Sequence, residues 1–175
     1  MAVPRPIAVV ALVVLAAACF ATFGLSSEAV VDALGCAVLV AVTVTDLERR
    51  VVPNRIIVPA LAIALVVQTV RDPSVEWIVA SLAAGGFYFI AALIYPAGIG
   101  MGDVKLAAFL GAWLGVTVIV ALFAGSLLAL IPAIVILAVR GKEARKIGIP
   151  YAPFLAGGAV IALFFGDAIM DWWLG

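Results

Sequence analysis

Two aspartates stand where long apolar stretches begin or end, and their chemistry suits peptide hydrolysis. Asp46 closes the apolar stretch 38–45, and Asp103 opens the stretch 104–115. Two carboxyl groups a few ångströms apart share a proton, because both cannot ionise cheaply, so one is an acid and the other a base. Such a pair can deprotonate a water molecule that attacks a peptide carbonyl and can protonate the developing oxyanion. Each also has a structural alternative: Asp46 in a solvated polar loop, and Asp103 as a helix cap after Gly102.

The residues around each aspartate favour a functional interpretation. Pro53 and Asn54 follow the first aspartate by seven and eight positions and turn the chain before the next apolar stretch. Three glycines at every second position, among them Gly100 and Gly102, precede the second aspartate. Glycine leaves the backbone bare beside a carboxylate, so we expect another helix or a substrate to approach there.

Composition places these residues in a membrane protein. Of the 175 residues, 67% are hydrophobic and 11% are charged, whereas a soluble domain has about 45–50% apolar and about 25% charged residues. The composition excludes a soluble globular domain, and the balance of ten acids against ten bases excludes a disordered chain. The chain has no histidine, and its two cysteines show no C-x-x-C spacing. We therefore expect neither a metal nor a cofactor.

The apolar stretches predict an all-α membrane protein, a polytopic bundle of about 6–7 transmembrane helices in a single domain over 1–175. Stretches long enough to cross about 30 Å of hydrocarbon lie at about 6–24, 29–46, 55–71, 76–96, 116–139 and 153–172. A seventh stretch, 103–114, is shorter and is expected to cross partly or to tilt. We interpret 6–24 as an extra N-terminal helix before a core of about 29–172. A cleaved signal peptide is the alternative, but the uncharged run favours a retained helix.

The basic residues predict the orientation, because cytoplasmic loops carry the excess of lysine and arginine. If all seven stretches cross, one side receives Arg5, Arg49, Arg50, Arg55, Lys105, Arg140, Lys142, Arg145 and Lys146. The opposite side receives Arg71 with the acids Glu28, Asp32, Asp72, Glu76, Asp167 and Asp171. The chain is therefore expected to be N-in/C-out, with Asp46 and Asp103 both at the cytoplasmic face. The basic cluster 140–146 sets this topology or holds anionic lipid headgroups.

Two motifs together resemble those of a known protease family. The first is D-L-x-x-x-x-V-P-N at 46–54, and the second is G-M-G-D-V-K-L at 100–106. With the later stretch I-P-Y-A-P-F-L at 149–155, they resemble the type IV prepilin peptidases, intramembrane aspartyl proteases of the G-x-G-D group. The similarity covers about residues 30–172. The G-x-G-D motif alone is weak, and the spacing of the aspartate to P-N with the V-K-L extension makes the resemblance specific.

The resemblance implies an aspartic-type endopeptidase with Asp46 and Asp103 as its catalytic pair. Such an enzyme removes the leader peptide of a prepilin at the cytoplasmic membrane face, just after a glycine. Lys105 matches the lysine of the motif and is expected to have a structural or electrostatic role, or to be an interfacial anchor. Gly100 and Gly102 are expected to allow close approach of a substrate or of the opposing helix.

The resemblance also implies a compartment and partners. The chain lacks the paired C-x-x-C motifs of the larger, methyltransferase-associated members, so it resembles the short form found with tight-adherence (Flp-like) pili. We expect a multi-pass protein of the bacterial inner membrane that acts on a prepilin or pseudopilin. Its other expected partners are membrane lipids and pilus assembly machinery, without nucleic acid. The oligomeric state is left open.

Two other functions compete with this interpretation. A proton-coupled membrane transporter would use the aspartates as a relay, but it predicts acids staggered through the membrane and internal repeats. Another G-x-G-D protease, of the signal-peptide-peptidase kind, would cut inside a transmembrane helix. Those enzymes usually have tyrosine before the first aspartate, where this chain has Thr45.

Overall fold

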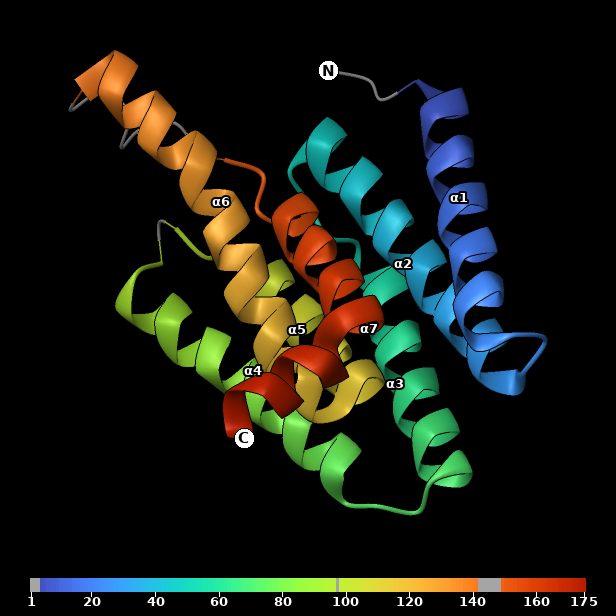
Figure 1. The fold of residues 1–175 in the computed structure, drawn as a ribbon. Helices are drawn as coiled ribbons and strands as arrows, with labels where there is room; N and C mark the ends of the chain where they lie inside the picture. Colours follow the sequence, from blue (N-terminus) through green and yellow to red (C-terminus); the bar gives the residue numbers. More distant parts are fainter. Residues whose placement is uncertain (1–3, 97, 142–148) are drawn as a thin grey trace.

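The structure is a computed structural model of the chain, and it describes residues 4–96, 98–141 and 149–175. These residues form seven α-helices and no strand. The helices are α1 (Arg5–Phe23), α2 (Ser27–Arg49), α3 (Asn54–Arg71), α4 (Glu76–Ile94), α5 (Met101–Leu114), α6 (Val118–Arg140) and α7 (Ala152–Leu174). Their bounds lie within a few residues of the predicted apolar stretches, so the predicted all-α bundle is confirmed (Figure 1).

The helices have the length and composition of a membrane bundle. Six stretches of the described residues are long and apolar enough to cross a membrane. Five are the single helices α1, α2, α3, α4 and α7, and the sixth, Met101–Val139, contains both α5 and α6. With 14 residues, α5 is about 21 Å long at ~1.5 Å per residue, shorter than the ~30 Å of a hydrocarbon core. The predicted short segment is therefore a helix of its own.

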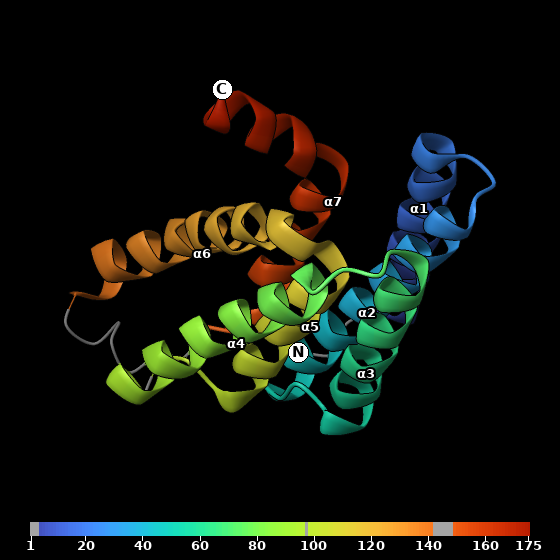
Figure 2. The ribbon, with the colours of Figure 1, turned by 90° about the horizontal axis from the view of Figure 1, so that it is seen from below.

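A glycine ends α5 and turns the chain into α6. Gly115 has φ of 59°, a left-handed conformation that favours glycine, and a Cβ atom there would collide with the Glu76 side chain. A 3₁₀ turn, Gly115–Thr117, follows. From this turn α6 packs along α7 and then extends beyond it, as Figures 1 and 2 show.

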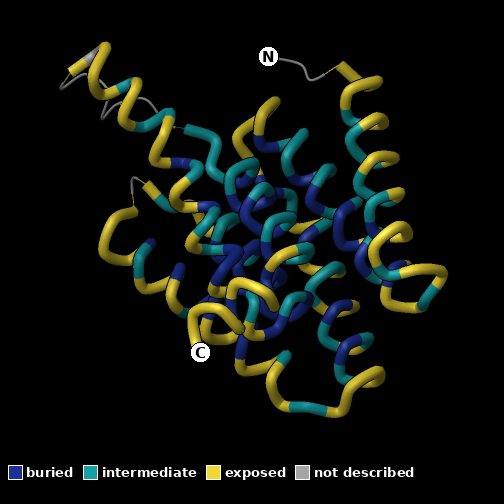
Figure 3. Tube along the Cα trace, in the orientation of Figure 1, coloured by how far each residue is buried: buried dark blue, intermediate teal, exposed yellow. Residues whose placement is uncertain are grey.

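α5 lies at the centre of the bundle. Eight of its 14 residues are buried, and α3, α4 and α7 pack around it. Figure 3 shows the buried part of the chain concentrated there, with exposed residues on the outer helices. Small residues allow this packing: Gly111 lies against the α4 backbone at Ala80 and Ser81, where a Cβ atom would overlap. Close helix contacts at small residues are typical of membrane interfaces, where apolar burial alone does not drive association.

α1 is an outer helix. It packs mainly on α2, and Cys19 is the one buried residue among its 19. At its end the Phe23 ring stacks on Phe164 of α7, with the ring centroids 6.1 Å apart. The predicted N-terminal helix therefore packs on the outside of the bundle.

The helix ends lie at two opposite ends of the bundle. In Figure 1 the start of α1 and the ends of α2 and α6 point toward the top and are spread across the bundle, and the ends of α3 and α7 lie at the bottom with the start of α4. Of the basic residues that the orientation argument uses, Lys142, Arg145 and Lys146 lie outside the described residues.

Candidate active site

Asp46 lies in the last turn of α2 and holds the start of α7. The helix ends three residues later, where Arg50 adopts a left-handed conformation with φ of 53°. The Asp46 side chain is only 6% exposed. Its Oδ2 atom accepts a hydrogen bond from the backbone N–H of Ala152, the first residue of α7, at 3.1 Å. A carboxylate at a helix N-terminus satisfies a free N–H group and interacts favourably with the helix dipole.

Asp103 lies in the first turn of α5 and is half-buried. Its Oδ2 atom accepts a hydrogen bond from the Gly100 N–H at 3.0 Å, and its own N–H donates to the Gly100 carbonyl at 3.0 Å. The helix cap is therefore Gly100, with Asp103 as the third helical residue reaching back to it. The alternative that makes Asp103 itself the cap residue is therefore wrong, although its carboxylate does accept a backbone N–H group at the start of the helix.

The segments that carry the two aspartates contact each other. A tight contact beneath them joins the two motifs: a Cβ atom on Gly102 would lie 2.8 Å from Cβ of Val52, in the turn after α2. Gly102 therefore allows close approach of the turn after α2, and the expected approach of a substrate or of the opposing helix stays a prediction. Gly100 has more room, because its nearest neighbour would be the Asp103 Oδ2 atom at 3.4 Å.

The other predicted residues join α3 to α5. Lys105 Nζ donates a hydrogen bond to Asn54 Oδ1 at 2.7 Å. Pro53 is the cap residue of α3, and its carbonyl accepts the N–H groups of Ile56 and Ile57 at 3.0 Å each. Because proline fixes its own φ angle, it sets the direction in which α3 leaves the turn. The structure thus brings the two predicted motifs together in space.

A cluster of three hydroxyl groups was not predicted. The Tyr151 hydroxyl is 3.0 Å from the Tyr88 hydroxyl and 3.0 Å from Ser126 Oγ. Tyr88 is 3% exposed. Tyr151 directly precedes Ala152, whose N–H binds Asp46. A tyrosine inside an apolar run is a usable signal, because a buried hydroxyl needs a partner.

The site combines two carboxyl groups, each held by a backbone N–H group, with a cluster of three hydroxyl groups around Tyr151, directly before α7. Among the residues that the structure describes, no three histidine, cysteine or acidic side chains gather as metal ligands would. The chemistry available to these side chains is proton transfer by the paired carboxyls.

Comparison with known proteins agrees with the predicted resemblance. Residues 33–134 match the type IV leader peptidase family. A prepilin leader peptidase/N-methyltransferase of Bacillus subtilis is 36% identical over 160 residues, which cover 87% of this chain and 62% of the relative. The enzymes of that name from Legionella pneumophila and Burkholderia pseudomallei are 30% and 32% identical, with coverage of 87% of this chain and 56% and 52% of the relatives.

The chain thus spans between about half and three fifths of the length of these relatives. No solved structure matches it significantly. The family match covers more than half of the chain and includes both aspartates with the glycines and the lysine around Asp103. The chain therefore belongs to the type IV leader peptidase family.

Proposed function

We propose that this chain is an intramembrane aspartyl endopeptidase that removes the leader peptide of type IV prepilins, with Asp46 and Asp103 as its catalytic residues. The observation that carries the proposal is the contact between the two segments that bear the carboxyls, within the matched part of the chain: Gly102 lies against Val52, and Lys105 donates to Asn54. The relatives' printed name, prepilin leader peptidase, supplies the substrate class.

The reaction follows from one proton shared between two carboxyls. The ionised carboxylate takes a proton from water, whose oxygen attacks the carbonyl carbon of the scissile peptide bond. The protonated carboxyl gives its proton to the carbonyl oxygen, so a neutral tetrahedral intermediate forms. When the intermediate collapses, the C–N bond breaks and the leaving nitrogen takes the proton that one carboxyl had removed from water. One hydroxyl of the intermediate returns its proton to the other carboxylate, so the starting pair is restored. The two sites titrate as one pair, so the roles belong to the pair.

The contacts around the pair support this assignment. Both backbone hydrogen bonds engage Oδ2, on Asp46 from Ala152 and on Asp103 from Gly100. We assign the Oδ1 atoms to water and substrate. The Lys105–Asn54 bond and the Gly102 contact hold the start of α5 beside the turn after α2, which is a positioning role.

We further propose that the pair faces the cytoplasm in a bacterial inner membrane, in an N-in/C-out chain that forms one peptidase domain and cuts just after a glycine. The excess of basic residues on the side of the aspartates supports the orientation. A prepilin of the tight-adherence (Flp-like) kind is the proposed substrate, and anionic lipids and pilus assembly machinery are the proposed partners.

The test is leader removal by the purified full chain in detergent, on a prepilin with a glycine before its hydrophobic helix. Asp46→Asn and Asp103→Asn should each lower the cleavage rate by at least about 100-fold, in line with the loss of a general acid or base. Asp171→Asn, an exposed acid at the end of α7, is the control and should cleave normally. Full cleavage by either variant of the pair would refute the proposal.

The position of the cut distinguishes the proteases. Mass spectrometry of the product should show an N-terminus directly after the juxtamembrane glycine. A cut inside the hydrophobic helix would instead indicate a protease of the signal-peptide-peptidase kind.

A further inference from the structure

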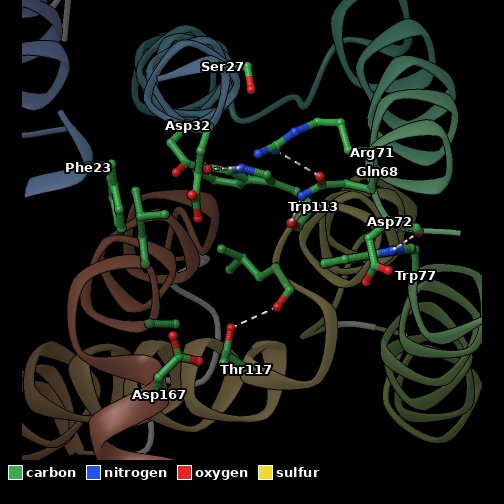
Figure 4. Close-up of a pocket in the computed structure, with 14 residues that line it drawn as sticks. Phe23, Ser27, Asp32, Gln68, Arg71, Asp72, Trp77, Trp113, Thr117 and Asp167 are labelled. Atoms are coloured by element: carbon green, nitrogen blue, oxygen red, sulfur yellow. Dashed lines mark hydrogen bonds between the residues drawn. The ribbon is translucent and has the colours of Figure 1, made fainter. Parts of the chain in front are cut away.

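A buried hydrogen bond joins α2 and α5 at the end of the bundle opposite to the two aspartates. The indole N–H of Trp113, in the last turn of α5, donates to Asp32 Oδ1, in the second turn of α2, at 3.0 Å. Trp113 is 3% exposed and Asp32 is 6% exposed. Figure 4 shows the pair in the wall of a cavity of about 540 Å³ between α2, α3, α5 and α7. The sequence had placed Asp32 only among the acids of the far side.

Packing reinforces this bond. The Trp113 ring lies directly on the α2 backbone at Gly35, where a Cβ atom would overlap the six-membered ring. Trp113 therefore contacts α2 at two positions, Asp32 through its N–H group and Gly35 through its ring, which are three residues apart. A flat ring held at both points resists sliding along α2 as well as rotation.

A second helix holds the same turn of α5. Gln68 of α3 donates from Nε2 to the Trp113 carbonyl at 2.7 Å, and its Oε1 accepts from Arg71 at 3.3 Å. Carbonyls in the last turn of a helix have no partner within the helix. Gln68 satisfies one of them, and so the end of α5 is bound to both α2 and α3 (Figure 4).

Elsewhere α2 and α5 approach each other at few points in the described part of the chain. Each nevertheless carries one aspartate of the proposed pair. Asp32 and Asp46 are separated by 14 residues of α2, about 21 Å, and Trp113 and Asp103 by ten residues of α5, about 15 Å. Neither helix contains an internal proline, so a shift at one end is transmitted to the other.

We propose that Asp32 and Trp113 are positioning residues that set the axial register of α2 against α5, and so the separation of Asp46 and Asp103. This inference rests on the proposed function. Its bond lies far from the reacting atoms and takes no part in proton transfer. The carboxylate serves as a hydrogen-bond acceptor, so its charge is not required.

The kinetic test compares Trp113→Phe, Asp32→Leu and Asp32→Asn. The first two remove the bond and should lower kcat about 10- to 100-fold with KM changed less than about threefold, because a displacement of about 1 Å costs up to about 100-fold in rate. Asp32→Asn keeps an acceptor oxygen and should retain kcat within about threefold. Equal damage from Asn and Leu, or a normal kcat in Trp113→Phe, would overturn the proposal.

A matched control separates positioning from general stability. Ser81 of α4 donates to the Ala108 carbonyl of α5 at 2.9 Å and is 5% exposed. Ser81→Ala removes a similar buried bond to α5 from a helix that carries no member of the pair. It should lower the unfolding midpoint as much as Trp113→Phe does, yet leave kcat within about threefold. A similar loss of kcat in both would reduce Asp32 and Trp113 to structural residues and overturn the proposal.

A second readout does not depend on proteolysis. In a chain with Cys19 and Cys36 replaced by alanine, Asp46→Cys and Asp103→Cys together allow cross-linking by a short bifunctional maleimide. Adding Trp113→Phe should change the cross-linking yield at least about threefold, and adding Ser81→Ala should leave it unchanged. An unchanged yield with Trp113→Phe would overturn the positioning role, whether or not the chain cleaves a prepilin. Absence of cleavage by the parent chain and by every variant would instead count against the proposed function.

Discussion

Asp46→Ala is expected to weaken the fold as well as abolish cleavage, whereas Asp46→Asn should abolish cleavage with little loss of stability. The reason is the hydrogen bond that Asp46 Oδ2 accepts from the Ala152 N–H at 3.1 Å. Ala152 is fully buried, so water cannot replace a lost acceptor. The two variants thus separate the chemical role of this carboxylate from its role as a helix cap.

The magnitude follows from the kind of bond lost. A hydrogen bond to a charged group contributes about 1.5–3 kcal/mol, and an unsatisfied buried donor costs about 1–3 kcal/mol. Asp46→Ala should therefore lower the free energy of unfolding by about 2–3 kcal/mol. Asparagine keeps a neutral acceptor, and the expected loss is about 1 kcal/mol or less.

Unfolding in mixed micelles with increasing dodecyl sulfate, followed by circular dichroism, measures the difference. Asp171→Ala, at an exposed acid near the end of α7, is the control and should stay within about 0.5 kcal/mol of the parent. Equal unfolding free energies for the alanine and asparagine variants of Asp46 would show that the capping bond does not stabilise the protein, and the reasoning would fail.

Two further predictions concern the contacts between the motifs. Gly102→Ala should lower kcat/KM at least about tenfold and the free energy of unfolding by about 1–3 kcal/mol, because its Cβ atom would lie 2.8 Å from Val52. Gly100→Ala is the control, since its Cβ atom would lie 3.4 Å from its nearest neighbour, and it should cleave within about threefold of the parent. Similar cleavage rates for the two variants would contradict this prediction. Lys105→Met and Asn54→Ala should each destabilise slightly, and the double variant should show a coupling of about 0.5–1.5 kcal/mol in a double-mutant cycle. Strict additivity would mean that the 2.7 Å bond between them contributes nothing.

The helices and the meeting of the motifs were predictable from sequence. A helix that crosses hydrocarbon needs about 20 apolar residues, so the apolar runs located α1 to α4, α6 and α7 closely. From position alone, Asp46 and Asp103 each had a structural alternative. They stood out because of the motifs around them, the P-N after the first and the G-x-G before the second. Their common side of the membrane followed from counting seven crossings and stays a prediction, because α5 and α6 together form one of six membrane-length stretches in the described residues.

The contacts that orient the pair were not predictable. The donor to Asp46 is the backbone N–H of Ala152, 106 residues away, and a backbone group has no sequence signal. Trp113 and Asp32 are 81 residues apart, and each by itself fits an ordinary explanation, an interfacial tryptophan and a loop acid. Their pairing depends on how the ring rests on Gly35, which composition and spacing do not encode.

The short central helix α5 frees the site from the thickness of the lipid bilayer. A helix that faces lipid must match the hydrocarbon thickness by tilting or by deforming the bilayer. α5 packs against other helices and ends at Gly115. Its length is therefore set by contacts with these helices, and it does not need to match the hydrocarbon thickness. A change in bilayer thickness should therefore change the position of Asp103 only indirectly, by tilting the outer helices. The depth of Asp103 in the bundle is set by the packing of α5 against its neighbours.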